Sequence, residues 1–276
     1  MNKGYTILTI QELRQSLRST WFWVYSLLFG GFVAVMFALG ITESQIIGFV
    51  GLGRLMVTFM QVSMVILPIY VLITTVRSVV GDRETHVMEY ILSLPLSFRS
   101  YFWAKLTSRF FEVFVPVFLA LLGAALWGSV SRINVPWDMF GLYSSLLAVM
   151  VFSFLGIGMY VSAIASSQNM AVSTVFIIWL VLVAFLDLIL MGAMLKFRLD
   201  PEIVIGVGMI NPLQVFRTAT LALFDPKLTV MGAASYYILD TVSREIFIAF
   251  AVVYPLVIGF LFSMLGSRYF RKKDIV

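Results

Sequence analysis

Residues 81–105 read GDRETHVMEYILSLPLSFRSYFWAK and connect two strongly apolar segments. Charged side chains gather in this stretch, although only 12% of the chain is charged. Val87, Met88 and Ile91 are spaced at i, i+1 and i+4, which places them on one face of a helix. The pattern predicts a short amphipathic helix that lies on the membrane surface between two spans.

The ends of this predicted helix follow from the flanking residues. Asp82 suits a helix N-terminus, and Pro95 ends the helix because proline has no N–H and its ring crowds the preceding turn. Ser97 can then cap a second helix that runs into the membrane. We therefore expect residues 81–95 to form a lever whose displacement moves both neighbouring spans.

The composition indicates an integral membrane protein. The chain is 61% hydrophobic, and its mean hydropathy is +1.00, whereas soluble domains are about half apolar and about a quarter charged. Cysteine is absent, which excludes disulfides, thiolate metal sites and cysteine nucleophiles. His86 is the single histidine, so one chain cannot supply two. The net charge of +5 reports loop orientation and does not indicate nucleic-acid binding.

We expect an all-α polytopic protein, with one transmembrane domain over residues 1–276. An interfacial amphipathic helix is expected at 3–20. Residues 196–245 are expected to form an extracytoplasmic segment, because their apolar pieces are too short to cross about 30 Å of hydrocarbon. Six spans are predicted at 21–41, 55–80, 106–130, 139–164, 170–195 and 246–266.

Three features refine this layout. Pro68 is expected to kink the second span. Gly156 and Gly158 allow a close helix–helix approach in the fourth span. Arg109 and Glu112 are spaced for an (i, i+3) ion pair at the inner start of the third span. With both termini in the cytoplasm, twelve of the 19 Lys and Arg residues lie inside, which favours that orientation.

Missing motifs exclude several functions. The chain has no GxxxxGK[ST] motif, so it cannot hold ATP phosphates in that way. It also has no HExxH motif, which excludes an intramembrane zinc protease. No paired catalytic groups are present, and we expect a protein that is not an enzyme. If ATP drives it, a separate subunit must bind ATP and Mg.

The stretch VVGDRETHVMEYILSLPLSFRSYFWAK resembles the signature region of ABC-2-type transporter permeases. Those proteins show a GERE-like start, an LSLPVS-like run and a lysine before the third span. Residues 81–84, residues 92–97 and Lys105 match these three parts. The usual small residue and Thr-Leu pair are replaced at 86–88, and the resemblance extends over the whole chain.

This resemblance implies a homodimer of permeases in a bacterial or archaeal cytoplasmic membrane, each seated on a cytoplasmic ATPase subunit. The surface helix would be the coupling helix in the groove of that ATPase. The alternative is a helix that merely joins two spans. The residues implicated in coupling are Gly81, Asp82, Arg83, Glu84, Val87, Met88, Ile91 and Pro95.

A narrower resemblance lies at 210–221, INPLQVFRTATL, which is similar to the NosY-type permeases of the nitrous oxide reductase maturation system. It implies a periplasmic β-helical partner and a role in assembling the copper–sulfur centre of that enzyme. The alternative is a simple turn followed by an interfacial helix at 214–223. The candidate docking residues are Asn211, Pro212, Phe216 and Arg217.

Two further features remain open. Asp187 is the only carboxylate well inside a predicted span, so it is a proton or cation site, a gating contact at the dimer seam, or a structural hydrogen-bonding group. Met56, Met60 and Met64 recur at i, i+4 and i+8, and thioethers suit Cu(I), but methionines also fill apolar interiors. The rival functions are a general ABC-2 exporter of a lipid, drug or peptide, and an ion-coupled carrier centred on Asp187.

Overall fold

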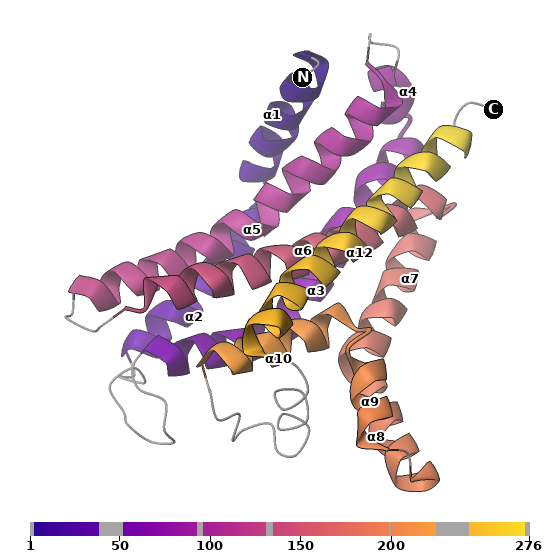
Figure 1. Cartoon of the computed structure of the whole chain (residues 1–276). Coiled ribbons are helices and arrows are strands. Elements are labelled where there is room, and N and C mark those ends of the chain that lie inside the picture. Colours follow the sequence, from indigo (N-terminus) through magenta and orange to yellow (C-terminus); the bar gives the residue numbers. More distant parts are fainter. Residues whose placement is uncertain are drawn as a thin grey trace.

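The computed structural model describes residues 3–38, 52–92, 96–130, 135–198, 200–224 and 243–273. The long helices of this part of the chain run together as a tilted bundle (Figure 1). Both ends of the described chain lie at the end of the bundle that also carries α4 (Figure 1). The helices are α1 (Lys3–Leu17), α2 (Thr20–Ala38), α3 (Leu52–Glu84), α4 (Val87–Leu92), α5 (Phe98–Val130), α6 (Trp137–Ile164), α7 (Gln168–Leu180), the π-helix η1 (Val181–Phe185), α8 (Leu186–Phe197), α9 (Pro201–Gly208), α10 (Pro212–Phe224) and α12 (Arg244–Lys273).

Within the described residues, 5 helical segments are long and apolar enough to cross a membrane. The first predicted span corresponds to α2, which is apolar but shorter. The prediction of an all-α polytopic membrane protein is therefore confirmed, with six as an approximate number of spans. The long segments are Val57–Glu84, Phe98–Val130, Trp137–Ile164, Gln168–Phe197 and Arg244–Arg271.

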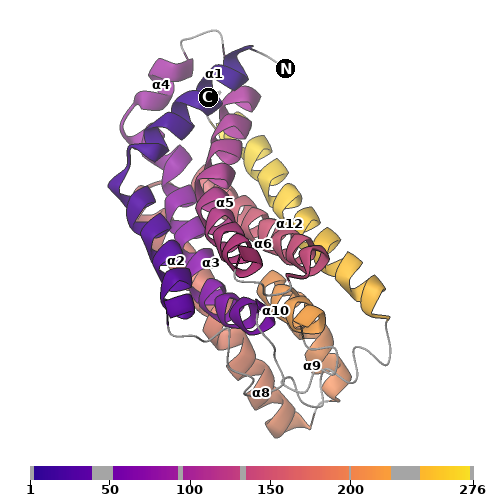
Figure 2. The same ribbon diagram turned by 90° about the vertical axis from the view of Figure 1, so that its left-hand side faces the viewer.

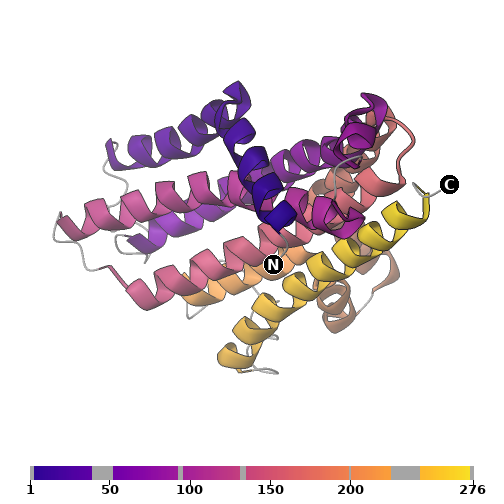
Figure 3. The ribbon, with the colours of Figure 1, turned by 90° about the horizontal axis from the view of Figure 1, so that it is seen from above.

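Helix α6 forms the centre of the bundle. It packs against α12, α3, α10 and α5, and most of its residues are buried. Seen from above, α2 and α12 lie at opposite edges with the other long helices between them (Figure 3). The core is therefore built around a helix whose apolar residues point in nearly every direction, as expected for a helix surrounded by others.

Glycines let α6 approach its neighbours closely. A Cβ on Gly156 would overlap the carbonyl oxygen of Gly259 in α12, and one on Gly259 would lie 2.6 Å from the carbonyl oxygen of Phe152. On another face, a Cβ on Gly158 would lie 3.1 Å from Thr75 of α3. The predicted close approach is confirmed, and both glycines of the fourth span take part in it.

Pro68 lies inside α3, as predicted. Proline cannot donate to the carbonyl one turn before it, and its ring disturbs the hydrogen bonds nearby. The indole Nε1 of Trp179 in α7 donates to the carbonyl of Val65 at 3.2 Å, within this disturbed turn. A neighbouring helix thus supplies a hydrogen bond where the proline weakens the helix's own.

Helix α10 is part of the core. Ten of its 13 residues are buried, and it packs against α6, α3 and α12. It lies at the end of the bundle opposite the termini (Figure 2). The helix expected at 214–223 in the alternative reading is present, and the chain folds this amphipathic helix back onto the bundle. The rest of the predicted outer segment, 225–242, lies outside the described residues.

The continuous helix formed by α7, η1 and α8 is the least covered of the spans. Ala171 and Val175 are its buried residues, and η1 and α8 contribute none. Together with α9, the lower part of this helix diverges from the bundle (Figure 1). Its apolar surface therefore faces lipid or another protein.

Candidate functional site

The predicted helix over 81–95 is wrong in its boundaries. Residues 81–84 form the last turn of α3, and α4 has only six residues, Val87–Leu92. The break falls at His86, whose φ of 58° is left-handed and ends α3. Asp82 is thus not at a helix N-terminus. Pro95 lies outside the described residues.

Asp82 binds α5. Its Oδ2 lies 2.9 Å from Nζ of Lys105 and accepts a 2.7 Å hydrogen bond from the hydroxyl of Tyr101. The side chain of Lys105 is only 3% exposed, and the carboxylates of Asp82 and Glu12 compensate its charge. The first acidic residue of the motif therefore connects the end of α3 to the N-terminal part of α5.

Arg83 binds the C-terminus of α6. It donates to the carbonyls of Ala163 at 3.3 Å and Ala165 at 3.1 Å. The last carbonyls of a helix have no partner within the helix, and they carry the negative end of its dipole. The guanidinium of Arg83 donates hydrogen bonds to these carbonyls and places a positive charge at the negative end of the dipole.

Glu84 binds the N-terminus of α7. Its Oε1 accepts a 3.0 Å hydrogen bond from the backbone N–H of Gln168, and Ser167 caps the same helix by accepting from Met170. Gly81 allows the approach, since a Cβ there would lie 3.2 Å from Nε2 of Gln168. We call residues 81–84 the α3 joint, because consecutive charged residues connect it to α5, α6 and α7.

Helix α4 has two faces. Met88 is buried, and Ile91 is half-buried against the core, so these two residues hold α4 to its own chain. Val87 and Tyr90 are exposed, by 42% and 73%. The expectation that Val87, Met88 and Ile91 share one outward apolar face is wrong, because the short helix turns Met88 inward. Val87 and Tyr90 form the exposed surface.

Helix α1 joins the same network. Nζ of Lys105 lies 2.9 Å from Oε1 of Glu12, and Ser16 donates to Glu112 at 2.8 Å. Arg109 pairs with Glu112, which confirms the predicted (i, i+3) pair, and it also lies 4.0 Å from Glu12. Helix α1 is therefore ion-paired to α5 and, through Lys105, to the α3 joint.

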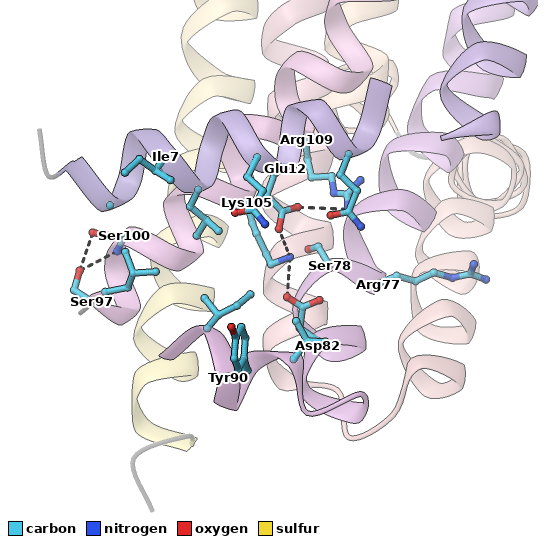
Figure 4. Close-up of a pocket in the computed structure, with 17 residues that line it drawn as sticks. Ile7, Glu12, Arg77, Ser78, Asp82, Tyr90, Ser97, Ser100, Lys105 and Arg109 are labelled. Atoms are coloured by element: carbon cyan, nitrogen blue, oxygen red, sulfur yellow. Dashed lines mark hydrogen bonds and ion pairs between the residues drawn. The ribbon is translucent and has the colours of Figure 1, made fainter. Parts of the chain in front are cut away.

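A cavity of about 1030 Å³ lies between α1, α3, α4 and α5. Figure 4 shows Lys105 between Glu12 and Asp82, with Arg77 at one side and Ser97 and Ser100 at the other. Ser97 accepts from the backbone N–H of Ser100, so its predicted role as the cap of α5 is confirmed. The charged lining residues are Glu12, Arg77, Asp82, Lys105 and Arg109.

At the opposite end of the bundle, Asn211 connects α10 to the π-helix. Its Nδ2 donates to the carbonyl of Leu182 at 2.7 Å, and its Oδ1 accepts from the backbone N–H of Leu213 at 3.0 Å. Asn211, Pro212 and Phe216 are buried. In this conformation a partner cannot contact these three predicted docking residues, and only Arg217 is accessible.

Arg217 lies 3.7 Å from Asp187 of α8, and Gln214 donates a hydrogen bond to the same carboxylate. Both members of the ion pair are about half exposed, at 44% and 45%. Of the alternatives for Asp187, a structural contact to a neighbouring helix agrees with this geometry. The partners are an arginine and a glutamine rather than Ser, Thr or Tyr.

The predicted methionine stripe is partly visible. Met60 is buried, and Met64 packs partly buried against the core. The side chain of Met56 lies outside the described residues. In the described part of the chain, no group of three or more His, Cys, Asp or Glu residues could hold a metal ion.

Several residues that form the polar contacts at the two ends of the bundle were not predicted. They are Glu12, Ser16, Tyr101, Gln168 and Gln214. Glu12 and Ser16 are one turn apart on α1, and that spacing was a usable signal for a polar face that meets another helix. Gln168 offered no signal, because its backbone forms the contact.

The comparisons with known proteins agree with this arrangement. Residues 6–275 match the family described as ABC-2 family transporter protein. The chain is also 22% identical, over 241 residues, to the "Probable ABC transporter permease protein NosY" of Stutzerimonas stutzeri, an alignment that covers 85% of this chain and 87% of that protein. The chain therefore belongs to the ABC-2 family of transporter permeases.

Proposed function

We propose that this chain is the membrane subunit of an ATP-driven complex, with ATP and Mg bound by a separate cytoplasmic ATPase that contacts α4. Both termini would lie in the cytoplasm, in a bacterial or archaeal cytoplasmic membrane. One observation carries the proposal: the consecutive residues Asp82, Arg83 and Glu84 each bond to a different neighbouring helix.

The α3 joint explains how a displacement of α4 would be transmitted to the neighbouring helices. A force on the exposed Val87 and Tyr90 displaces α4, which Met88 and Ile91 hold to the bundle. The displacement reaches the α3 joint through His86 and then acts on α5, α6 and α7 together. A helix that merely joined two spans would not need these three connections.

The test is co-purification and ATPase stimulation. We expect Val87→Glu together with Tyr90→Ala to abolish binding of the ATPase encoded with this permease, and with it the stimulation of hydrolysis. Phe197→Ala is the matched control, since it removes an exposed aromatic side chain at the far end of α8. Full binding by the double variant would refute the proposed contact.

We further propose that a second copy of the chain covers α7 and α8. The ion pair of Asp187 and Arg217 is half exposed on an otherwise apolar surface. Exposing charges to lipid is costly, so a protein neighbour is favoured. Since the chain has no cysteine, Leu188→Cys should give a disulfide-linked dimer on mild oxidation, whereas Leu119→Cys, exposed on α5, should not.

We infer a narrower role in nitrous oxide reductase maturation, with a periplasmic β-helical partner. The similarity to the NosY permease and the stretch at 210–221 support it. The test is the copper content of nitrous oxide reductase in cells where this chain is the sole permease of its type. An unchanged copper–sulfur centre after its deletion would favour a general exporter of a lipid, drug or peptide.

The methionine stripe can be tested in the same cells. If Met56, Met60 and Met64 handle Cu(I), replacing all three by leucine should lower the copper content of the reductase. The burial of Met60 favours packing instead, because leucine keeps the apolar volume. Unchanged copper content would therefore end the copper proposal for these residues.

A further inference from the structure

The cavity between α1 and α4 is lined by one cation that has no ion-pair partner among the described residues. Lys105 is paired with Glu12 and Asp82, and Arg109 with Glu112. Arg77 is exposed and forms no ion pair with any residue that the structure describes. With Glu112 counted, three cations and three carboxylates balance overall, and Arg77 is the cation of this set without a carboxylate partner among the described residues.

Arg77 lies about two turns before the C-terminal end of α3. Arg77 precedes Glu84 by seven residues, which corresponds to about 10 Å along a helix. Glu84 is the last residue of α3 and of the apolar segment Val57–Glu84, which is long enough to cross a membrane. If Val57–Glu84 crosses the bilayer in the proposed orientation, Arg77 lies at the depth of the lipid headgroups.

The rest of the lining suits an amphiphile. Ile7 and Leu8 of α1, Ile91 of α4 and Leu96 supply apolar surface. Hydroxyl and amide groups lie among them, including Ser97 and Ser100 at the side of the cavity away from Arg77 (Figure 4). A volume of about 1030 Å³ exceeds what a single ion needs and is within the range of organic-ligand pockets.

We propose that this cavity binds the headgroup of an anionic phospholipid from the cytoplasmic leaflet. The phosphate pairs with Arg77, the polar headgroup enters between α1 and α4, and the acyl chains leave along the apolar rim. Basic pockets on the cytoplasmic side of membrane helices suit anionic headgroups in this way. The leaflet assignment rests on the proposed orientation of the permease.

A bound lipid would stabilise the ATPase-facing side of the permease. It would fill the space between α1, which is held by Glu12, and α4, which is held by Met88 and Ile91. Tyr90 and Val87 line the rim of the cavity as well as the exposed face of α4. The lipid would thus contact the helix that the ATPase is proposed to move.

The test is native mass spectrometry of the full-length permease in detergent, without the ATPase, titrated with phosphatidylglycerol or phosphatidylcholine. We expect one tightly held phosphatidylglycerol per chain and weaker binding of phosphatidylcholine. Arg77→Gln should weaken phosphatidylglycerol binding about fivefold, the effect of one basic residue near an anionic headgroup. Arg99→Gln is the matched control, because Arg99 is exposed on α5 but does not line the cavity.

A second variant tests the contribution of the cavity volume independently of the charge of Arg77. Gln15→Trp fills the space without changing any charge, and it should also remove the bound lipid. Equal lipid binding by Arg77→Gln and Arg99→Gln would overturn the proposal. Displacement of the lipid by millimolar inorganic phosphate would assign the site to a soluble anion, and displacement by added ATPase would assign it to that partner. Since the titration needs no ATPase, failure of the proposed coupling would leave its result unchanged.

Discussion

Glu84 Oε1 accepts a hydrogen bond from the backbone N–H of Gln168 at 3.0 Å, so the last residue of α3 binds the first residue of α7. The two residues are 84 positions apart. The contact places a carboxylate at the positive end of a membrane helix, where a negative charge is stabilising. It also connects the end of α3 directly to the start of α7.

The first prediction concerns this contact. Glu84→Ala should lower the stability of the permease by about 0.5–1 kcal/mol, the usual cost of losing a helix-capping group. Glu84→Gln keeps an acceptor oxygen without the charge and should fall between Ala and the wild type. Thermal unfolding in detergent measures the stability, and ATP hydrolysis by the assembled complex measures the coupling.

The proposed joint requires a larger effect on coupling than on folding. We expect Glu84→Ala to reduce permease-dependent ATP hydrolysis severalfold, while insertion into the membrane is unchanged. If hydrolysis by the complex stayed at the wild-type rate, the contact with Gln168 would be a helix cap without a role in transmission.

The second prediction concerns Lys105. Replacing it by methionine would leave the carboxylates of Glu12 and Asp82 largely buried without their cation. Breaking a buried ion pair from one side costs about 3 kcal/mol or more. Thermal unfolding should show this loss, and Glu12→Gln with Asp82→Asn should recover most of it in the Lys105→Met background. A single variant as stable as the wild type would contradict the central role of Lys105.

Much of the fold could be predicted from the sequence. Long apolar runs require helices in a bilayer, because every backbone polar group needs an internal partner there. The apolar central parts of the predicted spans could be derived directly from this rule. The helix ends beside α4 and the chain termini could not, because α3, α5 and α12 continue past their apolar cores as helices. Residues 81–84 remain helical since their charged groups have partners on other elements, and hydropathy does not register such partners.

The candidate site was harder to predict than the fold. Residues 81–84 stand out in the sequence as a group, but their partners lie far away in the sequence, as Tyr101, Ala165 and Gln168 show. The burial of helix α10 was not predicted, for a related reason. Its 13 residues are too short for a span, and a short amphipathic helix fits the membrane interface and the bundle core equally well.

The third prediction concerns the crossing of α6 and α12. Gly156→Ala should destabilise the permease by about 1–3 kcal/mol, because its new methyl group would overlap the carbonyl oxygen of Gly259 and force two backbones apart. Gly141→Ala is the control on the same helix, since nothing lies within 4 Å of a Cβ there. The control should be neutral or stabilising, and equal destabilisation of both variants would contradict the close packing.

The fourth prediction concerns the ion pair between Asp187 and Arg217. Both side chains are nearly half exposed, so in a monomer their coupling should be at most about 1 kcal/mol. If a second copy covers α8, the pair loses contact with water or lipid and its coupling should increase. A double-mutant cycle with Asp187→Asn and Arg217→Gln, measured by unfolding in sodium dodecyl sulfate, gives this coupling free energy directly.

The cycle can be run on two states of the same protein. The permease with Leu188→Cys, cross-linked into a dimer, should show a larger coupling free energy than the same protein kept reduced and dilute. Gln214 hydrogen-bonds Asp187 in both states, so its contribution cancels in the comparison. Equal coupling in the two states would mean that Asp187 and Arg217 stay exposed in the dimer, and the proposed seam would have to lie on another face of the bundle.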